Sequence, residues 1–270
     1  MALGDSTLTG SATPLDAVLG IAKGTIKNHI PIFVIGGNTS VGTLAEAIWE
    51  CGSHLPNVDI SQTYTLTSTD PADSFSGTGA QVARVAGLDA NHDPVVESIT
   101  VGGKTSELHR INNFFVAVSG SNKGNVGTLS LVGDTDGLSY ACMLPGRASN
   151  SGAVFTVPEG MRLLISEFNW FVGRKQTTEM DIDAVFEVEV EGLPFNTVQR
   201  VRIASTNSQG TSSASSTFPI PASFPERTTV WFEATSGTPT AEVGVFFSGI
   251  LVDNLNRGLS PSDIMGTTRP

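Results

Sequence analysis

The sequence predicts an all-β protein made of two β-sandwich (jelly-roll-like) lobes, with short helices only near the N-terminus. The clearest evidence is the stretch Gly79–Gly103, where two segments alternate apolar and polar residues on either side of a turn-favouring run of Asp, Asn, His, Asp and Pro. The same alternation recurs as far as Val252. No long helical pattern separates the segments, which excludes a parallel α/β sheet. In the first arm of this hairpin one face is expected to carry Val82, Ala86 and Leu88, and the other Gln81 and Ala83.

The composition fits one large β-domain or two smaller ones and excludes several classes of protein. The chain has 270 residues, of which 39% are hydrophobic and 15% charged, so it is too apolar to be disordered. The formal net charge of −11 argues against a surface made for nucleic acid, because phosphate binding needs clustered Lys and Arg. The longest apolar run, Pro31–Gly36, is too short to span a membrane. We therefore expect no nucleic acid and no membrane as partner.

Residues 1–25 are expected to form an N-terminal arm. Met1–Thr13 is small, polar and without periodicity, and Pro14–Ala22 fits one or two helical turns. Ile26–Ile35 is then predicted as a strand, which Pro31 confines to a sheet edge or a bulge because proline cannot donate a ladder hydrogen bond.

Residues 26–135 are assigned to the first β-sandwich lobe. After a loop at Gly36–Val41, Thr43 has the position of a helix cap, with Glu46 three residues on, for a short helix that ends at Gly52. Apart from the hairpin, further strands are expected at Gln62–Ser68, Glu107–Ser119 and Gly127–Val132.

Residues 136–252 are assigned to the second β-sandwich lobe, with the boundary at Gly133–Leu138. Met161–Val172 is apolar on both faces and is predicted as a central strand. Glu187, Glu189 and Glu191 fall on one face of a strand, where they would solubilise an exposed sheet. The predicted strands are Leu138–Met143, Ala153–Val157, Met161–Val172, Met180–Glu191, Val198–Ile203, Thr228–Ala234 and Ala241–Val252, the last two as a hairpin; Asn207–Thr217 is predicted as a loop.

Two acidic turns contain part of a calcium-binding pattern. Asp89, Asn91 and Asp93 have the spacing of the first three oxygen ligands of a calcium loop. Pro94 stands where such a loop needs glycine, and Thr100 where it needs a bidentate glutamate, so a hairpin turn is expected instead. Residues 134–137 (Asp-Thr-Asp-Gly) also favour a turn, and their two carboxylates leave a weak ion site open.

No zinc site is expected. The four histidines (His29, His54, His92 and His109) are scattered, with no pair at the spacing of metal ligands and neither cysteine beside one. Cys51 and Cys142 allow a disulfide, but free buried thiols are the expectation.

No catalytic residue is expected either. Residues 4–6 (Gly-Asp-Ser) are similar to the start of a hydrolase nucleophile block, but no buried strand precedes them and no Gly-x-Ser-x-Gly occurs. Nothing singles out a carboxylate pair for glycoside hydrolysis among the 26 acidic residues. Trp49, Trp170 and Trp231 would make a sugar-stacking platform if exposed, although apolar strands around the last two favour core positions. The sequence therefore predicts a protein that is not an enzyme and has no cofactor or metal site.

Several stretches resemble a structural virion protein of marine tailed bacteriophages. The pattern consists of turns and strand ends, and together the stretches cover most of Gly36–Asp253. The chain departs from it at His92, where such turns often carry glycine, which affects the type of hairpin only. The stretches are Gly36–Gly52, Ser74–Gly103, Leu108–Val132, Phe155–Arg174, Phe195–Ile203 and Phe218–Ser236.

The resemblance implies an accessory structural protein of the virion: a capsid decoration protein, a vertex or head-fibre base, or a tail-associated part. No catalytic residue accompanies the pattern. The acidic balance fits the capsid exterior, and the absence of a long helix argues against the major shell protein. Partners would then be other virion proteins, the major capsid protein or tail and vertex proteins. The alternative is a receptor- or carbohydrate-binding module of the phage tail, which an exposed Trp170 or Trp231 in a groove would favour.

Two further expectations concern assembly. Exposed edge strands need covering, so a homo-oligomer is expected, and the habit of the family favours a trimer. The tail, residues 253–270, is polar and expected to be extended. Because ordering a residue costs about 1–2 kcal/mol of backbone entropy, we expect at least one end of the chain to be ordered by contacts outside its own lobe.

Overall fold

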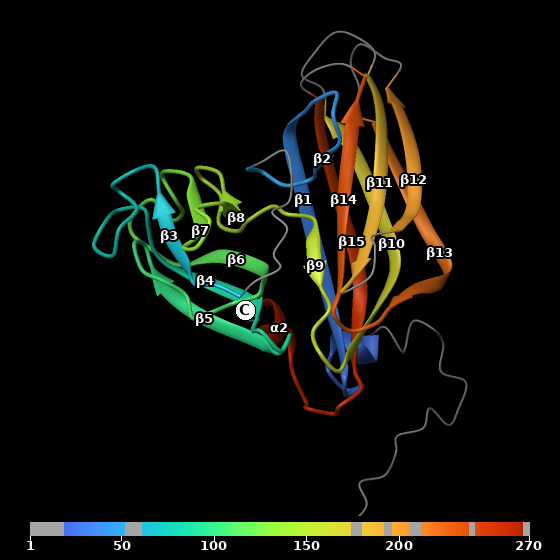
Figure 1. Cartoon of the computed structure of the whole chain (residues 1–270), viewed down its shortest axis with the longest axis horizontal. Coiled ribbons are helices and arrows are strands. Elements are labelled where there is room, and N and C mark those ends of the chain that lie inside the picture. Colours follow the sequence, from blue (N-terminus) through green and yellow to red (C-terminus); the bar gives the residue numbers. More distant parts are fainter. Residues whose placement is uncertain are drawn as a thin grey trace, which may run out of the picture.

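Two separate hydrophobic cores divide the chain into two β-lobes, which lie side by side in Figure 1. The computed structural model describes residues 19–51, 61–173, 180–191, 196–205, 212–237 and 241–266. Almost all of its regular structure is antiparallel strand, so the predicted all-β sandwich class is confirmed. In the described part of the chain no helix has the length and apolar character needed to cross a membrane.

The larger lobe is a sandwich of two sheets. Sheet A contains, in spatial order, β1 (His29–Val41), β15 (Ala241–Asp253), β10 (Met161–Gly173) and β13 (Ser212–Phe224). Sheet B contains β12 (Asn196–Ser205), β11 (Met180–Val190), β14 (Thr228–Ser236) and β2 (Glu46–Ala47), and β9 (Val154–Thr156) also pairs with β14. β10 lies inside its sheet and β1 at the edge, as their sequences predict.

The strand order of this sandwich is that of a jelly roll. If the eight strands β1, β2 and β10–β15 are counted along the chain, sheet A reads 1-8-3-6 and sheet B reads 5-4-7-2. The chain therefore crosses between the sheets at nearly every step, as two interleaved Greek keys require. The jelly-roll-like expectation is met in this lobe, which we call the jelly-roll lobe.

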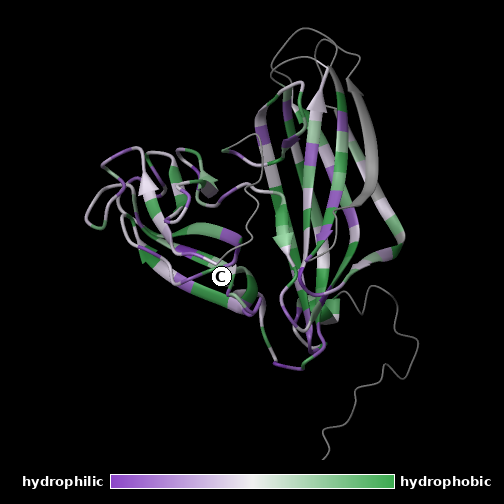
Figure 2. Cartoon of the chain, viewed as in Figure 1, coloured by the Kyte–Doolittle hydropathy of each residue, from purple (hydrophilic) through white to green (hydrophobic). Residues whose placement is uncertain are grey.

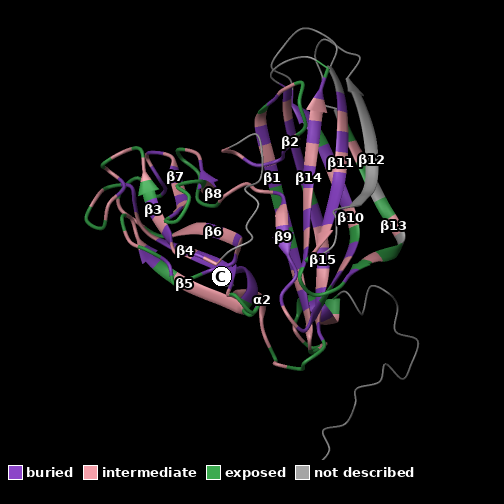
Figure 3. Ribbon diagram, viewed as in Figure 1, coloured by how far each residue is buried: buried purple, intermediate pink, exposed green. Residues whose placement is uncertain are grey.

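Aromatic side chains fill the space between the two sheets of the jelly-roll lobe. Phe186 and Phe232 stack with ring centroids 4.7 Å apart, and Trp170 meets Phe232 edge-on at 5.1 Å. Phe168 touches this group as well and is fully buried. Figure 3 shows the alternation that produces this core: along β14, buried residues alternate with partly exposed ones. Figure 2 shows the matching alternation of hydropathy along the strands.

The smaller lobe consists of two three-stranded sheets around a second core, and we call it the small lobe. Tyr64, Leu66 and Phe114 are among its fully buried side chains. The Gly79–Gly103 hairpin is confirmed, with β4 and β5 paired from Val82↔Thr100 to Leu88↔Pro94. One sheet has the order β3 (Tyr64–Ser68), β7 (Leu129–Gly133), β8 (Ser139–Met143), and the other β5 (Pro94–Thr100), β4 (Ala80–Leu88), β6 (Arg110–Ser119).

Of the two predicted faces of β4, the one that carries Ala83 points into the core of the small lobe, and bulges interrupt the strand. Ala83 and Val85 point into the core of the small lobe, whereas Val82 is only partly buried. The pairing of β4 with β6 slips at Ala80/Val82, Val82/Ala83 and Ala86/Gly87, and each irregularity changes which side chains face inward. A strict period of two along the sequence could not show these bulges.

The predicted division into residues 26–135 and 136–252 does not match the sheets. β1 pairs with β15 along nearly its whole length, from His29↔Val252 to Val41↔Ala241, so the first described strand belongs to the jelly-roll lobe. The small lobe is an insertion between β2 and β9, and residues 133–138 form the β7–β8 turn within it. The expected boundary failed because alternation reveals strands but not partners far away in the chain.

Four local predictions in the jelly-roll lobe are also wrong. The helix expected after Thr43 is replaced by β2, because residues 46–47 pair with β14 and the backbone N–H of Ile48 donates to Phe232 O at 2.8 Å. β1 continues through Gly36–Val41, and β13 includes residues 212–217, although both segments were expected to be loops. β14 and β15 are not a hairpin, since they lie in different sheets.

The described part of the C-terminal tail, residues 254–266, is ordered and reaches the small lobe. After β15 it forms α2 (Pro261–Met265), which has proline in its first turn and a capping box of Ser260 and Asp263. Ile264 and Met265 are buried and belong to the core cluster of the jelly-roll lobe, while α2 itself also lies beside β4 and β5 of the small lobe (Figure 1). The expected extended tail is corrected, while the expected ordering of one end outside its own lobe is confirmed. Of the N-terminal arm, residues 19–22 are helical and residues 1–18 lie outside the described part.

Candidate functional site: an apolar face and the joint between the lobes

The outer face of sheet A carries large apolar side chains in contact with solvent. Phe33 is 68% exposed and Ile35 60% exposed, both on the edge strand β1. Phe246 on β15 lies directly opposite Ile35, and Phe171 on β10 lies opposite Gly244, one pair further along β15. These four residues, Phe33, Ile35, Phe171 and Phe246, are neighbours on three adjacent strands, and we call them the sheet A face.

Gly244 allows the aromatic residues of the sheet A face to lie flat. A Cβ atom added at Gly244 would overlap the ring of Phe171, so this ring crosses the β15 backbone at a position without a side chain. The ring therefore extends from β10 over the next strand toward β1, and the apolar surface is continuous. Continuous exposed apolar area of this kind is typical of a surface that contacts another protein.

The hairpin turn between β4 and β5 docks on the jelly-roll lobe. Arg257 holds it in place, since its guanidinium donates to Glu159 O at 2.7 Å and also reaches carboxylate oxygens of Asp93 and Asp253, each at 3.3 Å. The backbone N–H of Glu159 donates to His92 O at 2.9 Å. Asp93 and His92 belong to the small lobe, so the turn is a built contact between the lobes.

Two asparagines of β6 make further bonds across the joint. Asn112 is buried and bonds the backbone of Thr156 on β9 in both directions, accepting from its N–H at 2.8 Å and donating to its oxygen at 2.9 Å. Asn113 donates to Met265 O of α2 at 2.7 Å. The small lobe is therefore fixed to both the jelly-roll lobe and the C-terminal helix.

A disulfide between Cys51 and Cys142 also joins the lobes, with Cα atoms 5.9 Å apart, which corrects the expectation of free buried thiols. Cys51 follows β2 of the jelly-roll lobe and Cys142 lies on β8 of the small lobe. Beside them the Glu50 carboxylate accepts from Leu144 N at 3.2 Å and lies 3.5 Å from Arg147 Nε. Burial raises the pKa of Glu50 despite both contacts. The sequence allows this pairing but cannot show that it forms, because the cysteines are 91 residues apart and only the fold brings them together.

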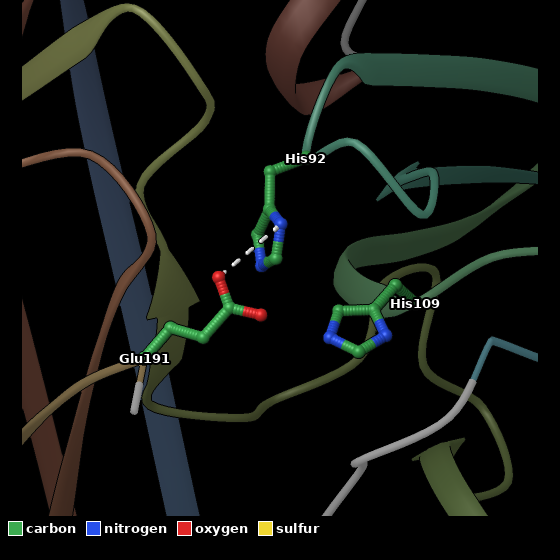
Figure 4. A group of neighbouring side chains, drawn as sticks. All are labelled: His92, His109 and Glu191. Carbon is green, nitrogen blue, oxygen red and sulfur yellow. Dashed lines mark ion pairs between the residues drawn. The ribbon is translucent and has the colours of Figure 1, made fainter. Parts of the chain in front are cut away.

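Two histidines that the sequence shows as scattered lie together at the same joint. His92 sits in the β4–β5 turn and His109 just before β6, and their rings meet edge-on with centroids 4.9 Å apart. Glu191, at the end of β11, approaches from the jelly-roll lobe to 4.0 Å from His92 Nδ1 (Figure 4). One ligand atom from each of the three lies within 4.8 Å of the others. His29 lies apart on β1, bonded to Lys27 O, and His54 is outside the described residues.

His92 is unusual in both backbone and side chain. Its φ of 64° is left-handed, which agrees with the glycine common at this position in similar turns. The side chain is 1% exposed, and neither ring nitrogen has a hydrogen-bond partner among the described residues. Burial lowers the pKa of His92; Glu191 opposes this change, while Arg110 and Arg227 add to it. The imidazole is therefore held in its neutral form.

The acidic turns behave as turns. Asp89 Oδ1 accepts from the backbone N–H groups of Asn91 and Asp93 at 2.8 and 2.9 Å, which fixes the hairpin and confirms the expectation there. Asp134 accepts from Thr65 Oγ1 at 2.6 Å and from Lys104 Nζ at 2.9 Å. Hydrogen bonds to hydroxyl groups and to Lys104 lower the pKa of Asp134 to about 2. These carboxylates are committed to the chain's own donors.

The tryptophans do not form a shared platform. Trp49 and Trp170 are buried, and Trp231, on β14, is half-buried with its indole N–H donating to Glu233 at 3.0 Å. Glu187, expected on an exposed face, is buried as well. Residues 4–6 lie outside the described part of the chain.

Sequence reasoning missed one buried carboxylate that organises the small lobe. Asp73 accepts hydrogen bonds from the backbone N–H groups of Ala80, Val126 and Gly127 and from Ser68 Oγ, at 2.7 to 2.9 Å. Burial favours a raised pKa for Asp73, but the four donors outweigh it and the pKa is lowered. The only signal in the sequence was an acidic residue in a turn-rich loop, which many exposed residues share.

No protein-family model and no curated protein matches the sequence. Weak likenesses exist to solved structures of infectious bursal disease virus. The structure of the Gx strain is 10% identical, with 85% of this chain and 74% of that chain covered and a TM-score of 0.26. The VP2 subviral particle is 11% identical, with coverages of 85% and 73% and a TM-score of 0.23. Likenesses at this level carry no argument, and the fold assignment rests on the strand order described above.

Proposed function

We propose that this protein is an accessory structural protein of a tailed-phage virion, placed on the capsid exterior and acting through protein–protein contacts. The observation that carries the proposal is the sheet A face, where Phe33, Ile35, Phe171 and Phe246 stand in solvent on adjacent strands. The sequence resemblance to marine tailed-phage virion proteins gives the proposal its direction.

The interior of the jelly-roll lobe supports a structural role over a ligand-binding one. Jelly rolls serve in viral capsids, in lectins and in cupins. Here the space between the sheets is occupied by the stacked rings of Phe186 and Phe232, together with Phe168 and Trp170. A ligand between the sheets would have to displace this core, so the outer surfaces remain for function.

The occupant that best fits the sheet A face is another copy of the same chain. The chain carries a formal net charge of −11, so two copies repel one another except where they meet through uncharged surface. None of the four residues of the face is charged, and β1 beside them is an edge strand whose outer side has no paired strand in the described part of the chain. A homo-oligomer follows from this reasoning, whereas the trimeric form rests on the habit of the family that the sequence resembles. Other virion proteins would contact the remaining surfaces.

The alternative of a receptor- or carbohydrate-binding module gains no support from the described residues. Trp170 is buried within the core, and Trp231 is half-buried and bonded to Glu233. An exposed aromatic ring next to a groove is what a sugar platform needs, and the exposed rings of this lobe form a flat apolar face instead.

The experiment is quantitative mass spectrometry of purified particles that carry the protein. The wild-type chain should be present at a fixed copy number relative to the major capsid protein. The double variant Phe33→Ser/Phe246→Ser should be incorporated at a small fraction of that level while remaining folded. Phe75→Ser is the matched control, because Phe75 is 70% exposed on the small lobe, away from the face, and its loss should leave incorporation unchanged.

A second variant tests the N-terminal arm. The first described strand, β1, begins at His29, so deletion of residues 1–13 removes no described strand. We expect a folded protein whose incorporation falls sharply. A chain that is absent from purified particles would contradict the proposal, and normal incorporation of the truncated chain would place the anchor on the lobes.

A further inference from the structure

The buried side chain of His92 is the starting observation. Its ring is 1% exposed, yet neither nitrogen has a hydrogen-bond partner among the described residues. Buried polar atoms in folded proteins are almost always bonded, so these two nitrogens are exceptional. An ordered water or a bound cation would satisfy them. The neighbours of His92 distinguish between the two.

The neighbours supply the rest of a metal-ligand set. His109 and Glu191 each place one ligand atom within 4.8 Å of the others and of His92, and Figure 4 shows the three side chains gathered around one point. A tetrahedral zinc ion at about 2.1 Å from its ligands requires them to be about 3.4 Å apart. Glu191 can move its carboxylate the short distance needed to reach this spacing, because its side chain is 41% exposed and directly follows β11.

We propose that His92, His109 and Glu191 bind one zinc ion that fastens the small lobe to the jelly-roll lobe. Two imidazoles and one carboxylate form a ligand set that zinc adopts with its fourth position open to water. Imidazole nitrogens favour zinc over calcium or magnesium, which take oxygen ligands. The proposal reverses the expectation from the sequence, where the two histidines are far apart and suggest no pair.

The charges around the cluster are compatible with a cation. Arg227 is the nearest positive group to Glu191, at 3.3 Å. It also bonds Glu159 at 2.6 Å, so the positive charge of Arg227 is neutralised by a carboxylate that is not a proposed ligand. Arg110 is the second positive group that acts on His92.

The site has a mechanical consequence. His92 and His109 come from the small lobe and Glu191 from the jelly-roll lobe, so an ion bound by all three resists separation of the lobes. It would act beside the Arg257 contact to Asp93, on the same hairpin turn. Metal binding should therefore raise the thermal unfolding midpoint of the folded chain.

The test uses tag-free, full-length protein that has been stripped with EDTA and dialysed. Cobalt titration followed by visible absorption reports tetrahedral geometry, and zinc competition against a chromophoric chelator reports affinity and stoichiometry. We expect one ion per chain. Glu191→Gln and His92→Gln should each weaken binding by at least about 100-fold, since loss of a mere outer-sphere partner typically costs 10–100-fold. His29→Gln is the matched control and should bind as the wild type does.

Glu191→Gln protects the test against failure of folding, because that carboxylate is partly exposed whereas His92 is buried. Absence of zinc binding to the wild type would overturn the proposal and assign the buried imidazole to water. Equal binding by wild type and Glu191→Gln would overturn it as well, since the ion would then sit elsewhere. Either result leaves the proposed virion role standing, because that role rests on the sheet A face.

Discussion

Removal of the Cys51–Cys142 disulfide should lower the free energy of unfolding by an amount that depends on the length of chain between the two cysteines. The cysteines are 91 residues apart, and the chain-entropy relation assigns about 4.6 kcal/mol to closing a loop of that length in the unfolded chain. This value is an upper limit. If the small lobe unfolds alone, the jelly-roll lobe still holds both ends of the insertion, so part of the loop is already closed. We therefore expect a loss of about 2–4 kcal/mol on reduction.

The aromatic residues allow each lobe to be followed separately in urea. Both tyrosines, Tyr64 and Tyr140, belong to the small lobe, whereas the three tryptophans belong to the jelly-roll lobe or to the segment after β2. Reductant should shift the tyrosine-detected transition of the wild type to lower urea and leave Cys51→Ser/Cys142→Ala unaffected. Two reactive thiols per chain in the denatured, unreduced protein would refute the reasoning, as would identical transitions with and without reductant.

Three further predictions concern stability. Asp73→Asn should destabilise the small lobe by about 3 kcal/mol or more, because the carboxylate accepts four hydrogen bonds; an unchanged tyrosine-detected transition would contradict this. Ile264→Ala should cost about 2 kcal/mol or more and speed amide exchange in α2, since Ile264 is buried in the core cluster of the jelly-roll lobe. The pKa of His92 is lowered in the folded state, so in EDTA the stability should be full above pH 6.5 and fall as the pH drops below that unfolded-state value. His92→Gln should remove this loss, and an equal slope in both proteins would exclude His92 as its source.

The strands could be predicted from the sequence because alternation is a local property. Along β14, buried and partly exposed residues alternate as the apolar and polar residues of its sequence predict. The β4–β5 hairpin is present, and Asp89 holds its turn as the turn residues indicate. β10 was placed centrally because it is apolar on both faces, and it lies between two strands. Strands and turns could therefore be predicted from the sequence, because the residues that determine each of them lie within about ten positions of one another.

The arrangement of the strands could not be predicted because its causes lie far apart in the chain. β1 pairs with β15, although the residues of both lobes lie between them in the chain. Neither segment contains a pattern that identifies the other as its partner. The same holds for β2, whose helical pattern yields to pairing with β14. The lobe to which a strand belongs depends on the strands with which it pairs. Because these pairings could not be predicted, the predicted boundary fell inside the small lobe.

The histidine cluster and the sheet A face could not be predicted for the same reason, since each depends on strands that are distant in the sequence. The histidine pair arises because the β4–β5 turn and the start of β6 lie side by side in one sheet, which requires the register of β4 with both neighbours. The sheet A face was hidden because Phe33, Phe171 and Phe246 each look like core residues in their own segments. Only the layered structure shows that, among the described residues, these side chains lie on the side of sheet A that faces away from sheet B.

If the chain works by contact through the sheet A face, its self-association should depend on the four apolar side chains of that face. Sedimentation velocity of the purified protein across the micromolar range measures this association. We expect a concentration-dependent oligomer for the wild type and for Phe75→Ser, and a monomer for Phe33→Ser/Phe246→Ser. A wild-type chain that remains monomeric throughout, or a double variant that associates as the wild type does, would contradict the role assigned to the face.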